Sequence, residues 1–412
     1  MRLSIFSLLL GCLCCTQLQA QDPFFLHFYG NQSTFNPAFV GRRGARSLTA
    51  KYHSQWGHQD ARAYRTYQVL LEESMPCFFL DWGLVATRDE EGEGLLTTNE
   101  FGFRTALFIP TSRGSTSRRG RVSTFQSNLR IGFGWHWGQR TIDYSRLVFL
   151  DQLDPLFGLF DADRNSNATS FQALNGEASP WYFSPSMGIS YHHAVDPRKV
   201  NSWVFDLGLA IHNASLFVSR DARQTASLRG LDNPLGERIV ASFEAEKVLH
   251  ESNGRFWSLR PQVVLQWQEG LGYAEFGTKV SWSRTFNFGL YYHLAQPVDV
   301  GPSTNWASLK LEIGGLSLGD EARFDLGLGY SVQNGGLNNY VAPPLEISVT
   351  MHFGKKSLGC SLIGRDDQGY YDKKGPMRCP LFNSGARSKM YDNVWYNPFI
   401  NKDPQNSNTI NN

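Results

Sequence analysis

The sequence predicts an all-β protein, a transmembrane antiparallel outer-membrane β-barrel of about 14 strands. Three observations predict it: an alternation of apolar and polar residues with a period of two, its recurrence along the chain, and an alternation of short and long connections. Residues 128–138, NLRIGFGWHWG, give the clearest example. One of its rows is apolar and aromatic and the other is polar or glycine, which places the two rows on opposite faces of a β-strand. Residues 203–211 and 345–353 repeat the apolar row.

The composition agrees with a barrel whose interior is polar. Hydrophobic residues make up 41% of the chain, charged residues 18% and aromatic residues 14%. Modest apolar content is expected when half of each strand faces a polar lumen. The formal net charge of +2 gives no overall field that favours nucleic acid as a partner.

The first 20 residues read as a signal peptide. Arg2 supplies the positive charge, and residues 3–15 supply an apolar core too short to span a bilayer as a helix. We expect cleavage after Ala20; the alternative is a lipoprotein cut before Cys12. The rest of the chain contains no apolar run long enough for a transmembrane helix, so the mature protein is either a barrel or a soluble exported β-sandwich.

The period-two segments define the expected domain organisation: an arm at residues 21–46, a barrel at 47–353 and a tail at 354–412. The expected strands are residues 47–56, 61–72, 77–88, 95–109, 128–138, 182–192, 201–213, 238–249, 255–267, 272–283, 285–294, 306–316, 323–332 and 345–353.

The connections between these strands test the order. With both ends of the barrel in the periplasm, alternate connections should be short inner turns and longer outer loops. Residues 139–181, 215–237 and 333–344 are long and fall on the outer side. Residues 111–121 are long and basic but fall on the inner side, so they are either a genuine insertion or a sign that strands four and five are mispaired. The run at residues 147–150 is assigned to the long outer loop.

Ionisable side chains fall on the polar rows, where they are expected to line the lumen. Their expected role is solvation and cross-strand pairing, and a selective solute path is the alternative. They are Arg130, His136, Asp206, His212, Glu275, Lys279, Lys310 and Glu312.

No motif predicts catalysis, a cofactor or a metal. The G-x-S-x-G spelling at residues 315–319 ends one strand and precedes another, whereas a nucleophile elbow must turn from a strand into a helix. His192 and His193 lie at a strand end without metal-site spacing. The basic runs at residues 42–44 and 118–121 are either solvated turns or contacts with anionic lipid or a periplasmic partner.

The two segments outside the barrel carry the remaining candidates. The arm lacks strand alternation, and Asn36-Pro37 favours a turn in it. It is either a lead-in that packs under the first strand or a plug or docking element. The tail is largely polar and is expected in the periplasm, with a disordered end. It either folds into the barrel mouth or docks a partner through residues such as Pro380, Phe382 and Trp395. Cys360 and Cys379 are a possible disulfide in it.

The arm resembles the start of mature proteins of the PorP/SprF family of the type IX secretion system. The pattern is D-P-x-F, an aromatic residue, an Asn and then N-P-A-x-x-G. This chain matches it without a gap at Asp22, Pro23, Phe25, Phe28, Asn31, Asn36, Pro37, Ala38 and Gly41. It departs at Gly30, where the family commonly has an aromatic residue, and at Gln32, where it usually has a proline. Further matches follow in order at Gln55-Trp56, at the glycine strand of residues 83–92 with Asp89, at Asp154-Pro155 and at Cys379-Pro380.

The resemblance implies a non-enzymatic component of type IX protein secretion. Such a protein would help to deliver or anchor secreted cargo, gliding adhesins among them, at the cell surface. Its implied partners are outer-membrane lipid, a secreted cargo protein and periplasmic or other secretion-system proteins. The alternative function is an outer-membrane channel or transporter for a small or hydrophobic solute.

Overall fold

The computed structural model describes the arm and the barrel, with gaps in their connections. The described residues are 25–26, 29–42, 46–57, 64–75, 80–92, 96–111, 125–154, 156, 158–159, 167–170, 177–195, 203–214, 236–252, 255–268, 271–282, 285–297, 304–318, 322–333 and 343–353.

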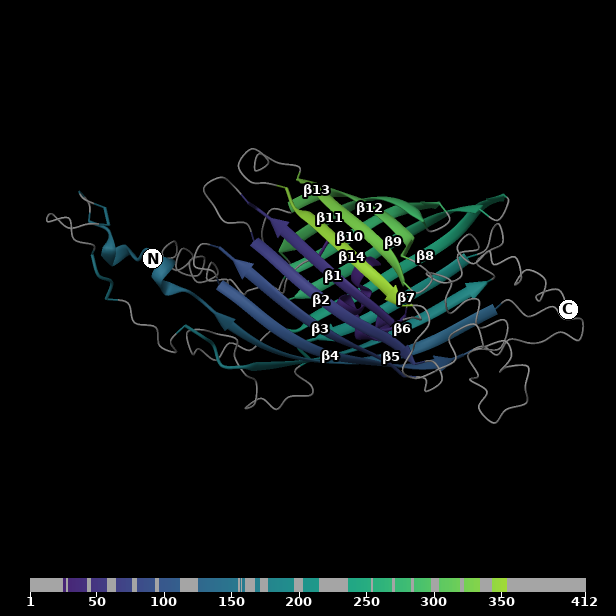
Figure 1. The fold of residues 1–412 in the computed structure, drawn as a ribbon, viewed down its shortest axis with the longest axis horizontal. Coiled ribbons are helices and arrows are strands. Elements are labelled where there is room, and N and C mark those ends of the chain that lie inside the picture. Colours follow the sequence, from purple (N-terminus) through teal and green to yellow (C-terminus); the bar gives the residue numbers. More distant parts are fainter. Residues whose placement is uncertain are drawn as a thin grey trace, which may run out of the picture.

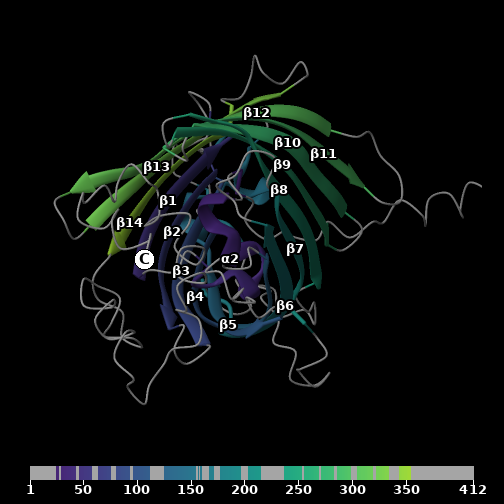
Figure 2. The ribbon, with the colours of Figure 1, turned by 90° about the vertical axis from the view of Figure 1, so that its right-hand side faces the viewer.

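The fold is a closed barrel of 14 antiparallel strands, each paired with its neighbours in the sequence (Figures 1 and 2). β1 pairs with β14 from Arg46 opposite Phe353 to Ser54 opposite Leu345, which closes the ring and leaves no sheet edge. The strands are β1 (Arg46–Gln55), β2 (Tyr64–Met75), β3 (Leu80–Glu91), β4 (Leu96–Pro110), β5 (Phe125–Thr141), β6 (Tyr182–Val195), β7 (Trp203–His212), β8 (Arg238–Ser252), β9 (Arg255–Gln268), β10 (Leu271–Trp282), β11 (Phe286–Pro297), β12 (Thr304–Leu318), β13 (Ala322–Gln333) and β14 (Leu345–Phe353).

The two faces of the wall have the chemistry that the alternation predicts. Leu207 and Ile347 face outward and keep 50% and 42% of their surface exposed. Phe133 and Trp135 also lie on the outward row, where the Trp135 ring stacks on Phe103 of β4 at 5.8 Å. All eight ionisable side chains expected in the lumen face inward. A soluble sandwich would bury the apolar row, so the placement identifies an outer-membrane barrel.

The pairing of β4 with β5 runs without a break from Thr97 opposite Thr141 to Pro110 opposite Asn128. Strands four and five are therefore not mispaired, and the long basic connection between them is an insertion that lies outside the described residues. Residues 147–150 form no strand. They lie in the connection between β5 and β6, between two short 3₁₀ turns, η4 (Tyr144–Arg146) and η5 (Leu150–Gln152), the second of which begins at Leu150.

The expected bounds of β2 and β3 are each about three residues too early. The ladder continues through polar residues, with Thr66 opposite Asp89 and Arg65 opposite Glu90. Inward polar residues keep their backbone pairing, so loss of apolar character does not end a barrel strand. In the part of the chain that the structure describes, no helix has both the length and the apolar character needed to cross a membrane.

The arm lies inside the barrel (Figure 2). It comprises η1 (Tyr29–Asn31), α2 (Gln32–Phe35) and η2 (Pro37–Phe39). Its last turn packs on β4, β5 and β6. The arm also contacts the first strand, as the lead-in interpretation expects, while it lies in the lumen, and a docking role for it stays a prediction. A 14-stranded barrel encloses more space than its own side chains fill, and the arm occupies that space.

Candidate functional site

The candidate site is the arm together with the wall that holds it. The turn at Asn36-Pro37-Ala38 is the centre of this contact. Asn36 is extended, with φ of −151°, and its side-chain Oδ1 accepts a hydrogen bond from the Ala38 amide at 2.9 Å. Pro37 begins η2 at a position whose amide would have no helical partner, so its missing N–H costs nothing. The turn is therefore stable by local geometry alone.

The same asparagine fixes the turn to the wall. Its Nδ2 donates to the carbonyl oxygens of Ile189 on β6 at 3.1 Å and Leu209 on β7 at 3.3 Å. One side chain thus binds both its own turn and two neighbouring strands. Alanine at this position loses all three hydrogen bonds.

Glycines on the inward rows make room for the turn. A Cβ atom at Gly132 of β5 would overlap the backbone of Pro37 and Ala38. A Cβ atom at Gly188 of β6 would overlap the Asn36 side chain. The inward glycines of β5 and β6 thus mark the places where the arm approaches the backbone of the wall closely.

Arg130 of β5 holds the chain just after the turn. Its Nε donates to the Ala38 carbonyl oxygen at 2.7 Å, and its terminal nitrogen contacts the Val40 carbonyl oxygen and the Asp81 carboxylate of β3. The guanidinium is buried, so these partners replace the water that it loses. Gly41 follows with φ of +66°, a left-handed conformation that glycine adopts without strain.

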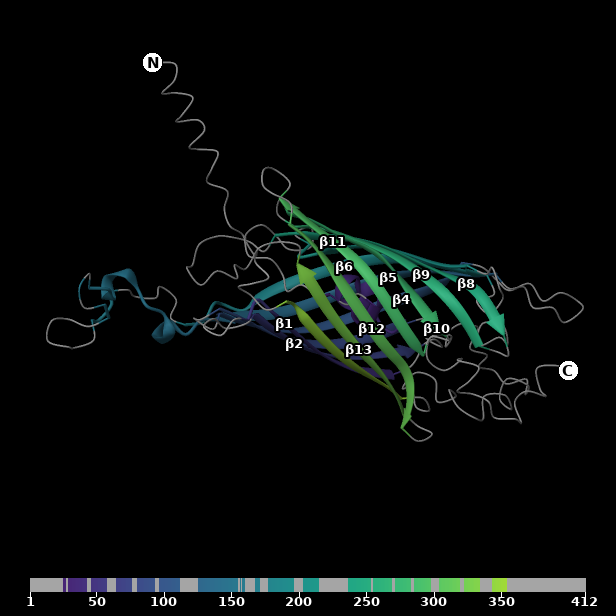
Figure 3. The same ribbon diagram turned by 90° about the horizontal axis from the view of Figure 1, so that it is seen from above.

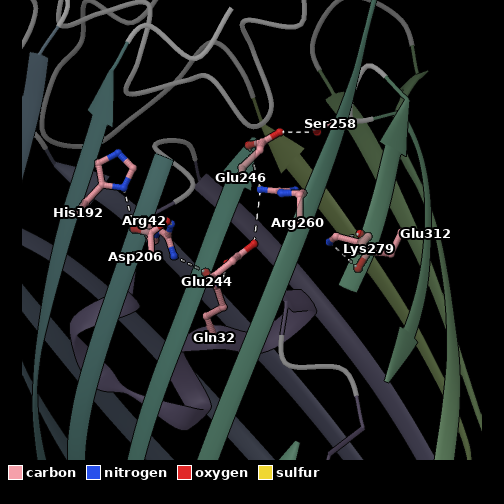
Figure 4. Close-up of polar contacts among 10 residues, drawn as sticks. All are labelled: Gln32, Arg42, His192, Asp206, Glu244, Glu246, Ser258, Arg260, Lys279 and Glu312. Atoms are coloured by element: carbon pink, nitrogen blue, oxygen red, sulfur yellow. Dashed lines mark hydrogen bonds and ion pairs between the residues drawn. The ribbon is translucent and has the colours of Figure 1, made fainter. Parts of the chain in front are cut away.

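A chain of polar contacts joins the arm to the opposite side of the barrel (Figure 4). The Arg42 guanidinium pairs with Asp206 of β7, whose other oxygen lies 2.6 Å from the Nδ1 atom of His192 on β6. Arg42 Nη1 also donates to Gln32 Oε1 at 3.1 Å, and Gln32 Nε2 donates to Glu244 of β8 at 3.0 Å. The arm is thereby tied to β6, β7 and β8 through charged side chains.

The amino-terminal end of the described arm is held by a second set of contacts. The Leu26 amide donates to Glu346 Oε2 on β14 at 2.6 Å, and Lys51 Nζ of β1 lies 2.7 Å from Glu346 Oε1. The Phe25 ring meets the His53 ring edge-on at 6.4 Å. A buried apolar cluster supports the middle of the arm: Phe25, Phe35, Phe39, Ala210, Val240 and Val264.

The wall of β10 to β12 pairs its own charges. Lys310 Nζ lies 2.7 Å from Glu275 Oε1, and Lys279 Nζ lies 3.0 Å from Glu312 Oε2. These four residues were expected in the lumen, and their pairing offsets the cost of burying charge. Among the described residues no group of three or more His, Cys, Asp or Glu side chains is arranged to hold a metal ion.

Comparison with protein families adds one decisive match. The family model described as "Type IX secretion system membrane protein PorP/SprF" matches residues 17–351. The chain belongs to the PorP/SprF family. The family consists of membrane proteins of a secretion system and is not an enzyme class. A comparison with curated proteins gave no match.

The barrel of this PorP/SprF protein is similar in fold to solved outer-membrane structures. The CymD monoaromatic hydrocarbon channel is 14% identical, with 83% of this chain and 96% of that chain covered and a TM-score of 0.37. A Pseudomonas aeruginosa FadL homologue is 11% identical, with 78% and 93% covered and a TM-score of 0.33. The Pseudomonas putida toluene transporter TodX is 10% identical, with 78% and 92% covered and a TM-score of 0.35. These likenesses concern the barrel fold alone.

The structure brings together five of the candidate motif residues of this PorP/SprF protein. Asn31, Asn36, Pro37, Ala38 and Gly41 all lie in the lumen, and Asn31 contacts the Gln68 amide of β2 and accepts from Thr34 Oγ1 at 2.6 Å. A docking role for them stays a prediction.

The other candidates lie elsewhere. Gln55 and Trp56 end β1, where Trp56 adopts a φ of +59° and its ring meets Tyr64 edge-on at 5.2 Å. Asp89 of β3 accepts a hydrogen bond from the Thr66 hydroxyl of β2. Cys360, Cys379, Pro380, Phe382 and Trp395 lie outside the described residues.

Arg42, considered in the sequence only as part of the basic run at residues 42–44, instead pairs with Asp206 and bonds Gln32 in the lumen. Several wall residues that hold the arm were not candidates from the sequence. They are Asp81, Arg104, Gly188, Glu244 and Glu346. The sequence did contain a signal for the recess in the wall, because Gly132 and Gly134 alternate with Arg130 on a row that must face the lumen. The spacing of these residues in the sequence did not show that the arm fills this recess.

Proposed function

We propose that this protein is a non-enzymatic outer-membrane component of type IX secretion that holds or delivers secreted cargo at the cell surface and contacts periplasmic partners. The observation that carries the proposal is the filled lumen. The arm is fixed to β1, β14 and the β5 to β8 wall, which favours a scaffold over an open conduit. Gliding adhesins are one class of cargo that fits the family.

The outer loop between β5 and β6 supports the cargo-binding part of the proposal. Its described residues project beyond the ends of the strands (Figures 1 and 3). Leu150 and Leu156 expose 86% of their surface there. The loop is nevertheless organised, because Asp151 accepts hydrogen bonds from the Ser170 amide at 2.6 Å and the Ser170 hydroxyl at 2.7 Å. An ordered loop with exposed apolar side chains suits contact with another protein.

The inner side of the barrel carries the proposed periplasmic contacts. Residues 354–412 follow β14 and contain Pro380, Phe382 and Trp395, which we propose as docking residues, with Cys360 and Cys379 as a disulfide that closes a loop. The basic run at residues 118–121 lies in the inner connection between β4 and β5. Anionic lipid or an acidic partner is the matching chemistry.

A channel or transporter for a small or hydrophobic solute is the second candidate. It is favoured by the polar inner wall, where serine and paired charged side chains follow β9 to β12. A polar inner wall of this kind can hold water, which a path for a solute requires. A solute path, however, needs the arm to leave or to yield, whereas a scaffold does not.

Two measurements separate the candidates. The scaffold should co-purify from native membranes in mild detergent with a secreted protein or a periplasmic component, identified by mass spectrometry. A variant lacking residues 354–412 should lose the periplasmic component, and one with the β5–β6 loop replaced by a short linker should lose the secreted protein. The two variants serve as controls for each other.

The second measurement is ion conductance in planar bilayers. The purified wild-type protein should give no steady conductance if the arm closes the lumen. The scaffold would be rejected, and the channel favoured, if two results occur together. The protein would give steady conductance, and no protein would co-purify with the wild type or with either variant.

A further inference from the structure

We infer that the recess on the inner face of β5, β6 and β7 is a peptide-binding site, which recognises a turn made of asparagine, proline and a small residue. The arm occupies this site as a ligand that belongs to the same chain. A segment of another protein that carries the same turn binds through the same contacts and takes the place of the arm. The inference concerns the wall and does not depend on the proposed function.

Four inward glycines on three neighbouring strands form the recess. They are Gly132 and Gly134 of β5, Gly188 of β6 and Gly208 of β7. A Cβ atom at Gly134 would lie 3.7 Å from the Cβ atom of Pro37, and a Cβ atom at Gly208 would lie 2.8 Å from Cζ of Phe39. Together with the overlaps at Gly132 and Gly188, these distances show a surface shaped to the turn over its whole length.

The backbone of the recess is held in place by the strands themselves. β5 pairs with β6 without a break from Phe125 opposite Val195 to Gly138 opposite Tyr182. β6 pairs with β7 without a break from Ser186 opposite His212 to Ala194 opposite Val204. These ladders fix the positions of the glycines whether or not the arm is present, so the site is preformed, as sites for ligands usually are.

Polar side chains of the wall bind the backbone of the turn. His212 Nε2 donates a hydrogen bond to the Phe35 carbonyl oxygen at 2.9 Å. Arg130 Nε donates to the Ala38 carbonyl oxygen at 2.7 Å, and its terminal nitrogen contacts the Val40 carbonyl oxygen. Every peptide has carbonyl oxygens, so these contacts contribute affinity and fix the direction of the bound chain, while its side chains must supply the specificity.

Three consecutive side chains of the turn supply that specificity. The Asn36 amide donates to the carbonyl oxygens of Ile189 and Leu209, and an aspartate there would place a carboxylate oxygen against both carbonyls. Pro37 has no N–H that needs a partner. Ala38 is fully buried, so the site has no room for a larger side chain at that position.

The recognised segment is short and does not include the connection to β1. The contacts to the recess come from residues 35–40, so a peptide of residues 32–42, QSTFNPAFVGR, contains all of them. The arm has the advantage of being tethered, which gives it an effective concentration of the order of mM. A second peptide therefore binds well only when the hold of the arm is weakened.

The test measures binding of this peptide, with a fluorescent label, to the full-length protein in mild detergent by fluorescence anisotropy. The substitution Asn36→Ala removes both hydrogen bonds from the asparagine of the arm to the wall, which should release the arm about 30-fold more often. The apparent dissociation constant for the peptide should fall by up to about 30-fold relative to the wild type. A control peptide with alanine in place of its asparagine should bind Asn36→Ala at least about tenfold more weakly than the unchanged peptide.

A second variant separates the recess from any other surface that could bind the peptide. Asn36→Ala combined with Gly132→Val has a released arm and a filled recess, so it should not bind the peptide. If the double variant does not fold, judged by loss of the heat-dependent shift in electrophoretic mobility, Gly188→Ala replaces Gly132→Val. The inference is overturned if Asn36→Ala does not bind the peptide, if it binds both peptides equally, or if filling the recess leaves binding unchanged.

Discussion

The substitution Asn36→Ala tests whether the turn in the arm holds the arm in the lumen. It removes the hydrogen bond from the Ala38 amide and the two hydrogen bonds to the carbonyl oxygens of Ile189 and Leu209. Only the two hydrogen bonds to the wall distinguish the held arm from the released arm, and at about 1 kcal/mol each their loss is about 2 kcal/mol. That free energy raises the population of the released arm about 30-fold, since 1.36 kcal/mol is a factor of ten.

Hydrogen–deuterium exchange on peptides that cover residues 29–42 measures this population directly. We expect exchange of these peptides to accelerate about 30-fold, while peptides from β8 to β12 exchange as in the wild type. The matched control is Asn287→Ala on β11, a buried inward asparagine whose Oδ1 has no hydrogen-bond partner among the described residues. Acceleration below about threefold in Asn36→Ala, or equal acceleration in Asn287→Ala, would refute the reasoning.

Three further predictions follow from the wall, the lipid face and the outer loop. Gly132→Val should expel the turn and make the arm sensitive to trypsin, because the new Cβ would overlap the backbone of Pro37 and Ala38. Gly329→Ala is the control and should leave the arm resistant to trypsin, because the nearest neighbour of its new Cβ would be 3.6 Å away. Leu207→Arg on the lipid face should lower the free energy of unfolding in bilayers by about 2–4 kcal/mol. Leu150→Arg in the outer loop is the control and should change that free energy by less than about 0.5 kcal/mol. Equal effects of the two substitutions would contradict the membrane placement. The Ser170 hydroxyl bonded to Asp151 holds the pKa of that carboxyl below its usual 3.8, so the loop is stabilised above that pH and loses this contribution as pH falls through the lowered pKa. Proteolysis of the loop by pepsin should therefore rise as pH is lowered below about 3.8, and Asp151→Asn should remove that dependence.

The barrel was predictable from sequence because one physical rule repeats along every strand. Outward residues meet lipid and inward residues meet polar groups, and this fixes a period of two along each strand. Residues 345–353 and the bounds of β14 agree at both ends. Strand ends such as Met75 and Glu91 were missed because the rule concerns side chains, whereas pairing of the backbone continues beyond the apolar row.

The position of the arm was not predictable in the same way. Phe35 and Phe39 show that the arm buries apolar surface, but burial under a strand and burial in the lumen give the same composition. The recess at Gly132 and Gly188 was visible as glycine on inward rows, without any sign of which segment fills it. Contacts such as Arg42 with Asp206 join residues far apart in the chain and depend on closure of the barrel.

The closed seam between β1 and β14 constrains how the molecule is assembled. The arm is synthesised before any strand, while the ring is complete only when β14 pairs with β1. A segment as bulky as η1, α2 and η2 is most simply enclosed while the sheet is still open, so the order of translation sets what the finished cylinder contains. Chains that stop before β14 would consequently leave this first-made segment accessible to proteases.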